Sequence, residues 1–70
     1  MTAKKQAKLI EDMVDASFKK NGNRIEFNIF DLGKIHKAGV AAAATGHTQE
    51  EVARNIDEAV IAAIAVYRKN

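Results

Sequence analysis

The sequence predicts a small, mainly helical domain with one short strand, in the order helix, strand, helix, helix. Two segments, residues 3–20 and 48–68, place apolar residues at three- and four-residue steps, which is typical of amphipathic helices. Residues 24–30 instead alternate between apolar and polar, which is typical of a strand. A chain of 70 residues without repeats or linkers forms one domain, spanning residues 1–70.

The first helix is expected over residues 3–20, where no glycine or proline interrupts the chain. Its apolar stripe consists of Leu9, Ile10, Met13, Val14, Ser17 and Phe18. Gly22 follows directly, and a glycine there can close the helix in the left-handed conformation.

The strand over residues 24–30 places Ile25, Phe27 and Ile29 on one side. A lone strand leaves backbone hydrogen-bonding groups without partners. Irregular backbone at the chain's own N-terminus could supply these partners, but nothing in the sequence supports that pairing. The least costly partner is the same strand of a second copy, so we expect the strand to be paired across a homodimer.

Asp31 is expected to cap the second helix, which runs to about Thr45 and ends at Gly46. Small residues, among them Gly33 and Gly39, dominate its surface. Glycine inside a helix costs roughly 0.5–1 kcal/mol relative to alanine, so close packing of another helix has to offset that cost.

The third helix begins with a capping box, Thr48-Gln49-Glu50-Glu51, and runs to about Arg68. Its second half is apolar on every side, which indicates that something covers every side. A second subunit is the natural cover. The predicted oligomer interface therefore combines residues of the strand and of the third helix: Ile25, Phe27, Ile29, Val60, Ala63, Ile64 and Tyr67.

The residues needed for catalysis and metal binding are few. The chain has no cysteine, and His36 and His47 are its two histidines, without a nucleophile or zinc pattern around them. We therefore expect no enzyme activity, no metal site and no cofactor. The longest apolar run, residues 59–67, is too short to cross a membrane. The basic residues at the beginning of the sequence are not followed by the apolar segment of a signal peptide. A cytoplasmic location is expected.

Basic residues gather between the first and second helices, although the net charge is only +2. They are either a solvated surface or a surface that contacts phosphates. The second interpretation gives a candidate nucleic-acid site: Lys19, Lys20, Arg24, Asn28, Lys34 and Thr48.

From Arg24 onward the order strand, helix, glycine, threonine, acid, helix resembles the ribbon-helix-helix family of dimeric DNA-binding regulators. The segment Gly46-His47-Thr48-Gln49-Glu50-Glu51-Val52 is similar to the turn of that motif, and the resemblance covers residues 24–67. It implies that the strands of two subunits pair and insert outward residues, here Arg24, Glu26 and Asn28, into the major groove of DNA.

Two alternatives stay open beside DNA binding. The mixed charge and the apolar third helix also fit a protein-binding inhibitor or adaptor of the kind that mobile elements encode. The N-terminus of the third helix, at Thr48, also fits an oligomer that captures a small anionic ligand between subunits.

Overall fold

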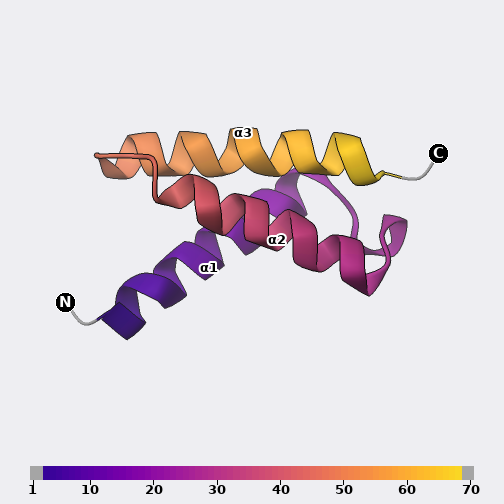
Figure 1. Cartoon of the computed structure of the whole chain (residues 1–70), viewed down its shortest axis with the longest axis horizontal. Helices are drawn as coiled ribbons and strands as arrows, with labels where there is room; N and C mark the ends of the chain where they lie inside the picture. The colour runs from indigo at the N-terminus through magenta and orange to yellow at the C-terminus, as the bar shows by residue number, and fades with distance from the viewer. Residues whose placement is uncertain (1–2, 69–70) are drawn as a thin grey trace.

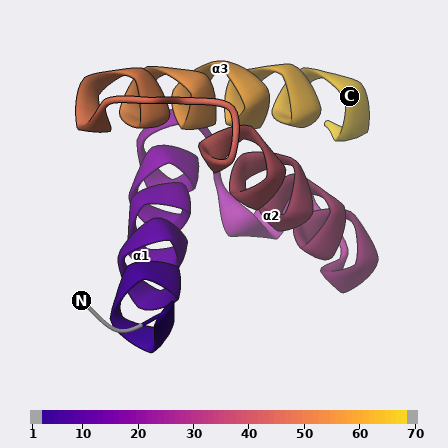
Figure 2. The same ribbon diagram turned by 60° about the vertical axis from the view of Figure 1, so that its left-hand side comes forward.

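The computed structural model describes residues 3–68, apart from the side chains of Ala3, Lys4 and Arg24. It contains three helices, α1 (Ala3–Asn21), α2 (Ile29–Ala43) and α3 (Gln49–Tyr67), with a short 3-10 turn, η1 (Arg24–Glu26), after α1. Helices α1 and α2 lie on the same side of α3 and diverge from one another beneath it (Figure 1, Figure 2). This arrangement forms a single small domain.

The predicted strand is wrong, because residues 3–68 contain no strand. The Asn28 side chain accepts a hydrogen bond from the Asp31 N–H at 2.8 Å, so Asn28 caps α2 and the helix begins earlier than expected. The Glu26 N–H is satisfied by the Asn23 carbonyl at 3.0 Å. Since the turn and the cap satisfy the local backbone, residues 24–30 form no strand that could pair across a homodimer.

The apolar residues that alternate over residues 24–30 therefore do not share one face. Phe27 is buried and packs edge to face against Phe18, with ring centroids 5.7 Å apart. Ile25 and Ile29 are exposed instead of sharing its face. Glu26, expected on a DNA-reading face, forms an ion pair with Arg68 at 3.3 Å, which ties η1 to the end of α3.

The first and third helices are confirmed at nearly the expected bounds. The Thr48 hydroxyl accepts from the Glu51 N–H at 3.1 Å, as a capping residue does. The return bond differs by one residue, since the His47 N–H, and not that of Thr48, donates to Glu51 Oε2 at 3.2 Å. The cap nevertheless fixes the start of α3.

The glycines after α1 and α2 do not act as expected, because no described residue has a positive φ. At Gly22 an added Cβ would lie 3.0 Å from Ile64 Cδ1, and at Gly46 it would lie 2.7 Å from the Val52 nitrogen. Gly46 therefore needs glycine because the backbone of Val52 lies close to it, whereas at Gly22 the end of the Ile64 side chain would have to shift to admit a Cβ.

The core lies where α3 crosses the other two helices. Gly39 of α2 brings the helices close together, since its Cβ would lie 2.7 Å from Val14 Cγ1 and 3.1 Å from Val60 Cγ2. Close packing was expected at both Gly33 and Gly39, and it is found at Gly39 alone, since an added Cβ at Gly33 would meet no atom of the described residues within 4 Å. The buried apolar residues are Val14, Phe18, Phe27, Ile35, Ala43, Ile56, Val60, Ala63 and Ile64.

Candidate binding surface

The basic residues of the candidate nucleic-acid site are largely engaged within the chain. Lys19 pairs with Asp15 at 3.1 Å, and Lys20 pairs with Asp57 at 3.7 Å. Lys34 lies over the Tyr67 ring, with its Nζ 5.4 Å from the ring centroid. The Arg24 side chain lies outside the described residues.

The polar residues of the same candidate site are helix caps. Asn28 caps α2 and Thr48 caps α3. Thr48 and Tyr67 lie at opposite ends of α3, about 28 Å apart at the rise of an α-helix. Since Lys34 contacts Tyr67, the structure does not bring Thr48 together with Lys34.

The residues of the predicted oligomer interface divide into two groups. Phe27, Val60, Ala63 and Ile64 are buried in the core of a single chain, and Tyr67 packs against that core. Ile25 and Ile29 remain at the surface. Only this second group is available to a partner without disrupting the fold.

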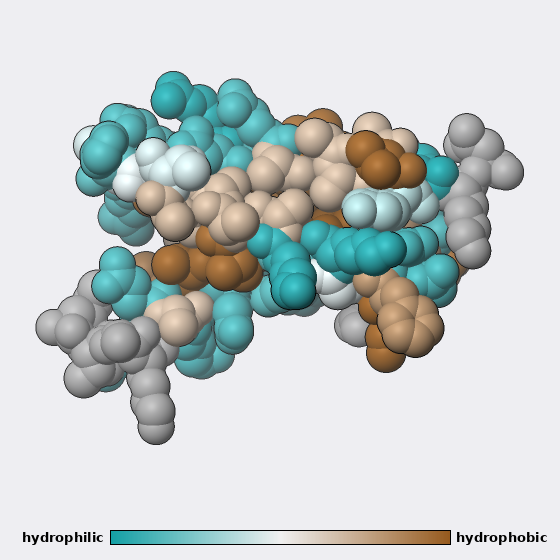
Figure 3. All heavy atoms as spheres, in the orientation of Figure 1, coloured by the Kyte–Doolittle hydropathy of each residue, from teal (hydrophilic) through white to brown (hydrophobic). Residues whose placement is uncertain are grey.

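Exposed apolar side chains gather where α2 begins. Ile25 is 88% exposed, Ile29 77% and Phe30 78%. We call these three residues the α2 patch. Apolar side chains project from the lower right of the molecule, the end at which α2 begins (Figure 3). Phe30 was not singled out by the sequence, because an alternating strand would separate it from Ile29.

A surface groove between α1 and α2 adjoins the α2 patch. Its volume is about 330 Å³. Two polar side chains, Asp15 and His36, lie among its lining residues, and Gly33 forms part of its wall. Its lining is otherwise apolar: Val14 and Phe18 from α1, and Ile29, Leu32 and Ile35 from α2.

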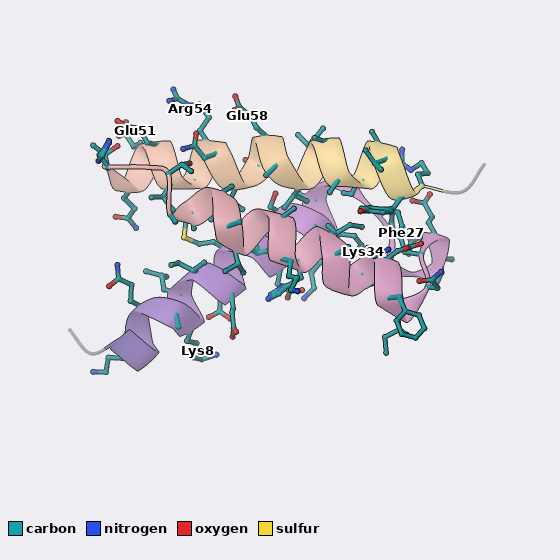
Figure 4. All side chains as sticks on the ribbon, viewed as in Figure 1. Lys8, Phe27, Lys34, Glu51, Arg54 and Glu58 are labelled. Carbon is teal, nitrogen blue, oxygen red and sulfur yellow. The ribbon has the colours of Figure 1, made fainter. Side chains whose placement is uncertain are left out.

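A second apolar surface covers the outer side of the C-terminal half of α3. It consists of Ile61, Ala62, Ala65 and Val66, all exposed, and we call it the α3 face. Apolar residues are visible over this half of α3 in Figure 3. In the N-terminal half, charged residues such as Glu51, Arg54 and Glu58 lie on the helix surface (Figure 4). The sequence indicated that this half of the helix is covered on every side; its own chain covers only the inner side, and a cover for the outer side stays a prediction.

A smaller groove, of about 270 Å³, lies between α1 and α3. The Lys20–Asp57 ion pair contributes to its lining. Ser17 also lines it, and its buried hydroxyl has no hydrogen-bond partner among the described residues. The other lining residues are Met13, Ala16, Ala53 and Ile56.

The described residues contain no group of three or more His, Cys, Asp or Glu side chains that could hold a metal ion. The two histidines lie in different places, His36 in the α1/α2 groove and His47 before α3. No helix within residues 3–68 is long and apolar enough to cross a membrane.

Comparisons of the chain with protein-family models, with curated proteins and with solved structures found no match.

Proposed function

We propose that this chain is a small non-enzymatic binding protein that forms a homo-oligomer and binds another protein. The observation that supports this is the pair of apolar surfaces, the α2 patch and the α3 face, that the chain leaves uncovered. A domain of 70 residues has a thin core, so an association that covers such side chains adds needed stability.

Two separate apolar surfaces suit a protein that makes two kinds of contact. One surface can join copies of the chain while the other binds a partner, as an adaptor or inhibitor does. Aromatic side chains are enriched in the centres of protein interfaces, and Phe30 is an exposed aromatic residue of this kind. Contiguous exposed apolar residues are otherwise uncommon in small proteins.

Binding of DNA has weaker support. Residues 24–30 form no strand that could pair into a ribbon, and Lys19 and Lys20 are ion-paired. Capture of a small anion at the start of α3 is also weakly supported, because Glu50 and Glu51 occupy the first turn and would repel it. A protein partner fits the apolar surfaces better than either ligand.

The oligomer is tested by sedimentation equilibrium of the purified chain over a range of concentrations. A monomer at every concentration would contradict the proposal. A mobility-shift assay with duplex DNA at low salt tests the alternative, since phosphate contacts are strongest there. Cell fractionation tests the cytoplasmic location, which is part of the proposal.

The partner is tested by co-purification on tagged wild-type chain, followed by binding of the two purified proteins. Val66→Lys, which places a charge on the α3 face, is the matched variant. We expect it to weaken capture, since a charge buried in an apolar interface is costly. Equal capture by both chains would show that the α3 face does not bind the partner.

A further inference from the structure

The dipeptide Asn21-Gly22 lies where α1 ends, with Asn21 as the last residue of the helix. Asparagine followed by glycine is the dipeptide at which a protein loses a side-chain amide most easily. Glycine has no Cβ, so nothing obstructs the approach of its backbone nitrogen to the asparagine side chain. Whether Asn21 deamidates in this chain therefore depends on the local backbone.

Deamidation begins with a bond between these two residues. The Gly22 nitrogen attacks Cγ of Asn21, and the proton of that nitrogen leaves with the side-chain nitrogen as ammonia. A five-membered succinimide ring remains. Water then opens the ring at either carbonyl and gives an aspartate or an isoaspartate in place of the asparagine. Water is the only co-reactant, so the chain needs no catalyst for this reaction.

The helix holds the attacking nitrogen away from the side chain. The Gly22 N–H donates to the Phe18 carbonyl oxygen at 2.7 Å, so the hydrogen-bond pattern of α1 continues through Gly22. In this pattern the N–H points back along the helix axis to the residue four positions earlier. The Gly22 nitrogen can therefore turn onto Asn21 only after its hydrogen bond to Phe18 breaks.

The side-chain amide of Asn21 is held as well. Its Nδ2 donates to the Ser17 carbonyl oxygen at 2.8 Å, which fixes the amide one turn back along α1. Asn21 and Gly22 are both half-buried. An added Cβ at Gly22 would lie 3.0 Å from Ile64 Cδ1, so the end of α1 packs against α3. Opening this end therefore costs two hydrogen bonds and the packing against another helix.

From these contacts we propose that Asn21 is a latent modification site, which the folded chain protects and which deamidates when the end of α1 opens. Its rate is the rate in an open backbone multiplied by the fraction of molecules that are open at this end. Deamidation of Asn21 therefore records how often the end of α1 opens. This inference concerns the lifetime of the chain and does not rest on the proposed function.

The product of the reaction does not fit the folded state. A carboxylate in place of the amide has no N–H to donate, and it places a negative oxygen against the Ser17 carbonyl oxygen. It also lies at the C-terminus of a helix, where the macrodipole disfavours negative charge. Lys19 and Lys20, the basic residues of the last turn, are already paired with other carboxylates. Each reaction therefore leaves the end of α1 permanently less stable.

The protection is tested on the full chain, incubated in buffer and in denaturing urea at the same pH and temperature. Peptide mapping by mass spectrometry measures deamidation at Asn21. We expect the rate in buffer to be about tenfold or more below the rate in urea, since an opening free energy of about 1.4 kcal/mol already gives a factor of ten. Equal rates would overturn the proposal. A product with aspartate and no isoaspartate would also overturn it, because direct hydrolysis does not require the helix to open.

A second test weakens the packing that holds the end of α1. Phe27 packs against Phe18, the residue whose carbonyl holds the Gly22 N–H. Phe27→Ala should raise the rate of deamidation in buffer toward the rate in urea, whether the variant folds weakly or not at all. The matched control is Phe30→Ala at low protein concentration, which removes an exposed ring and should keep the wild-type rate. Equal rates in the two variants would overturn the proposed protection by packing.

A third test measures the effect of the product with two substitutions that add the same charge. Asn21→Asp removes the donor to the Ser17 carbonyl, whereas Asn23→Asp keeps the Oδ1 acceptor that receives the Ile25 N–H at 3.2 Å. We expect Asn21→Asp to have the lower Tm by circular dichroism. Equal Tm values would overturn the destabilising effect of the product.

Discussion

Two glycines in α2 should respond in opposite directions to the same substitution. Gly39→Ala places a Cβ 2.7 Å from Val14 Cγ1 and 3.1 Å from Val60 Cγ2, both on fully buried side chains. Valine is stiff about χ1, so neither side chain can turn away easily. Gly33→Ala adds the same atom to the same helix, where no neighbour lies within 4 Å.

The magnitudes follow from two opposing terms. Replacing glycine with alanine inside a helix stabilises it by roughly 0.5–1 kcal/mol. Overpacking a core costs about 1–3 kcal/mol. Gly39→Ala should therefore lower the free energy of unfolding by about 1 kcal/mol, the difference between the midpoints of the two ranges. Gly33→Ala should raise it by about 0.5–1 kcal/mol.

Thermal melting followed by circular dichroism measures both effects. For a domain of this size 1 kcal/mol corresponds to a shift of about 4–8 °C in Tm. Gly33 is exposed, so the melts should be compared at several protein concentrations to separate association from folding. If Gly39→Ala melts at or above the wild-type temperature, the close packing of α2 against Val14 and Val60 is refuted.

Three further predictions concern the core and a helix cap. Phe27→Ala should lower the free energy of unfolding, measured by urea denaturation, by about 3–5 kcal/mol, because it removes a buried ring. Phe30→Ala removes an exposed ring, so at low protein concentration it should change the same free energy by less than about 0.5 kcal/mol. Equal effects would argue against the observed turn. Ala63→Glu should abolish the cooperative melt, since an unpaired buried charge costs several kcal/mol, comparable with the whole stability; a normal melt would place Ala63 at the surface. Thr48→Ala should lower the Tm, because it removes about 1 kcal/mol of capping free energy, whereas Thr48→Asp should keep the wild-type Tm. An equal fall in Tm for both variants would show that the hydroxyl of Thr48 does not cap α3.

Much of the fold could be predicted from the sequence. The apolar periodicity of α1 and α3 and the Thr48 cap depend on residues a few positions apart, and these elements are confirmed. The prediction of a strand from Arg24 to Phe30 was wrong. Its alternation fits a strand over seven residues, but Asn28 is also a good helix cap, and the cap prevails in the structure.

The candidate site was less predictable, because the strand predicted over residues 24–30 is wrong and its residues therefore lie on other faces than expected. With α2 started at Asn28, the helical spacing of Ile29, Gly33 and Val40 would have indicated an exposed apolar face. The predicted strand instead placed Arg24 and Asn28 on an outward face. Sequence also could not show that Lys19 and Lys20 are held by acidic neighbours, one of which comes from another helix.

By itself the sequence determined the helical character, the caps and the apolar stripes, since these depend on neighbours along the chain. Only the tertiary structure decided which apolar residues are covered. Val60 and Ile64 are covered by their own chain, whereas Ile29 and Phe30 are not. It also distinguished Gly39, which is packed against Val14, from Gly33, which is open. Both decisions depend on how helices distant in sequence cross, and periodicity carries no information about that crossing.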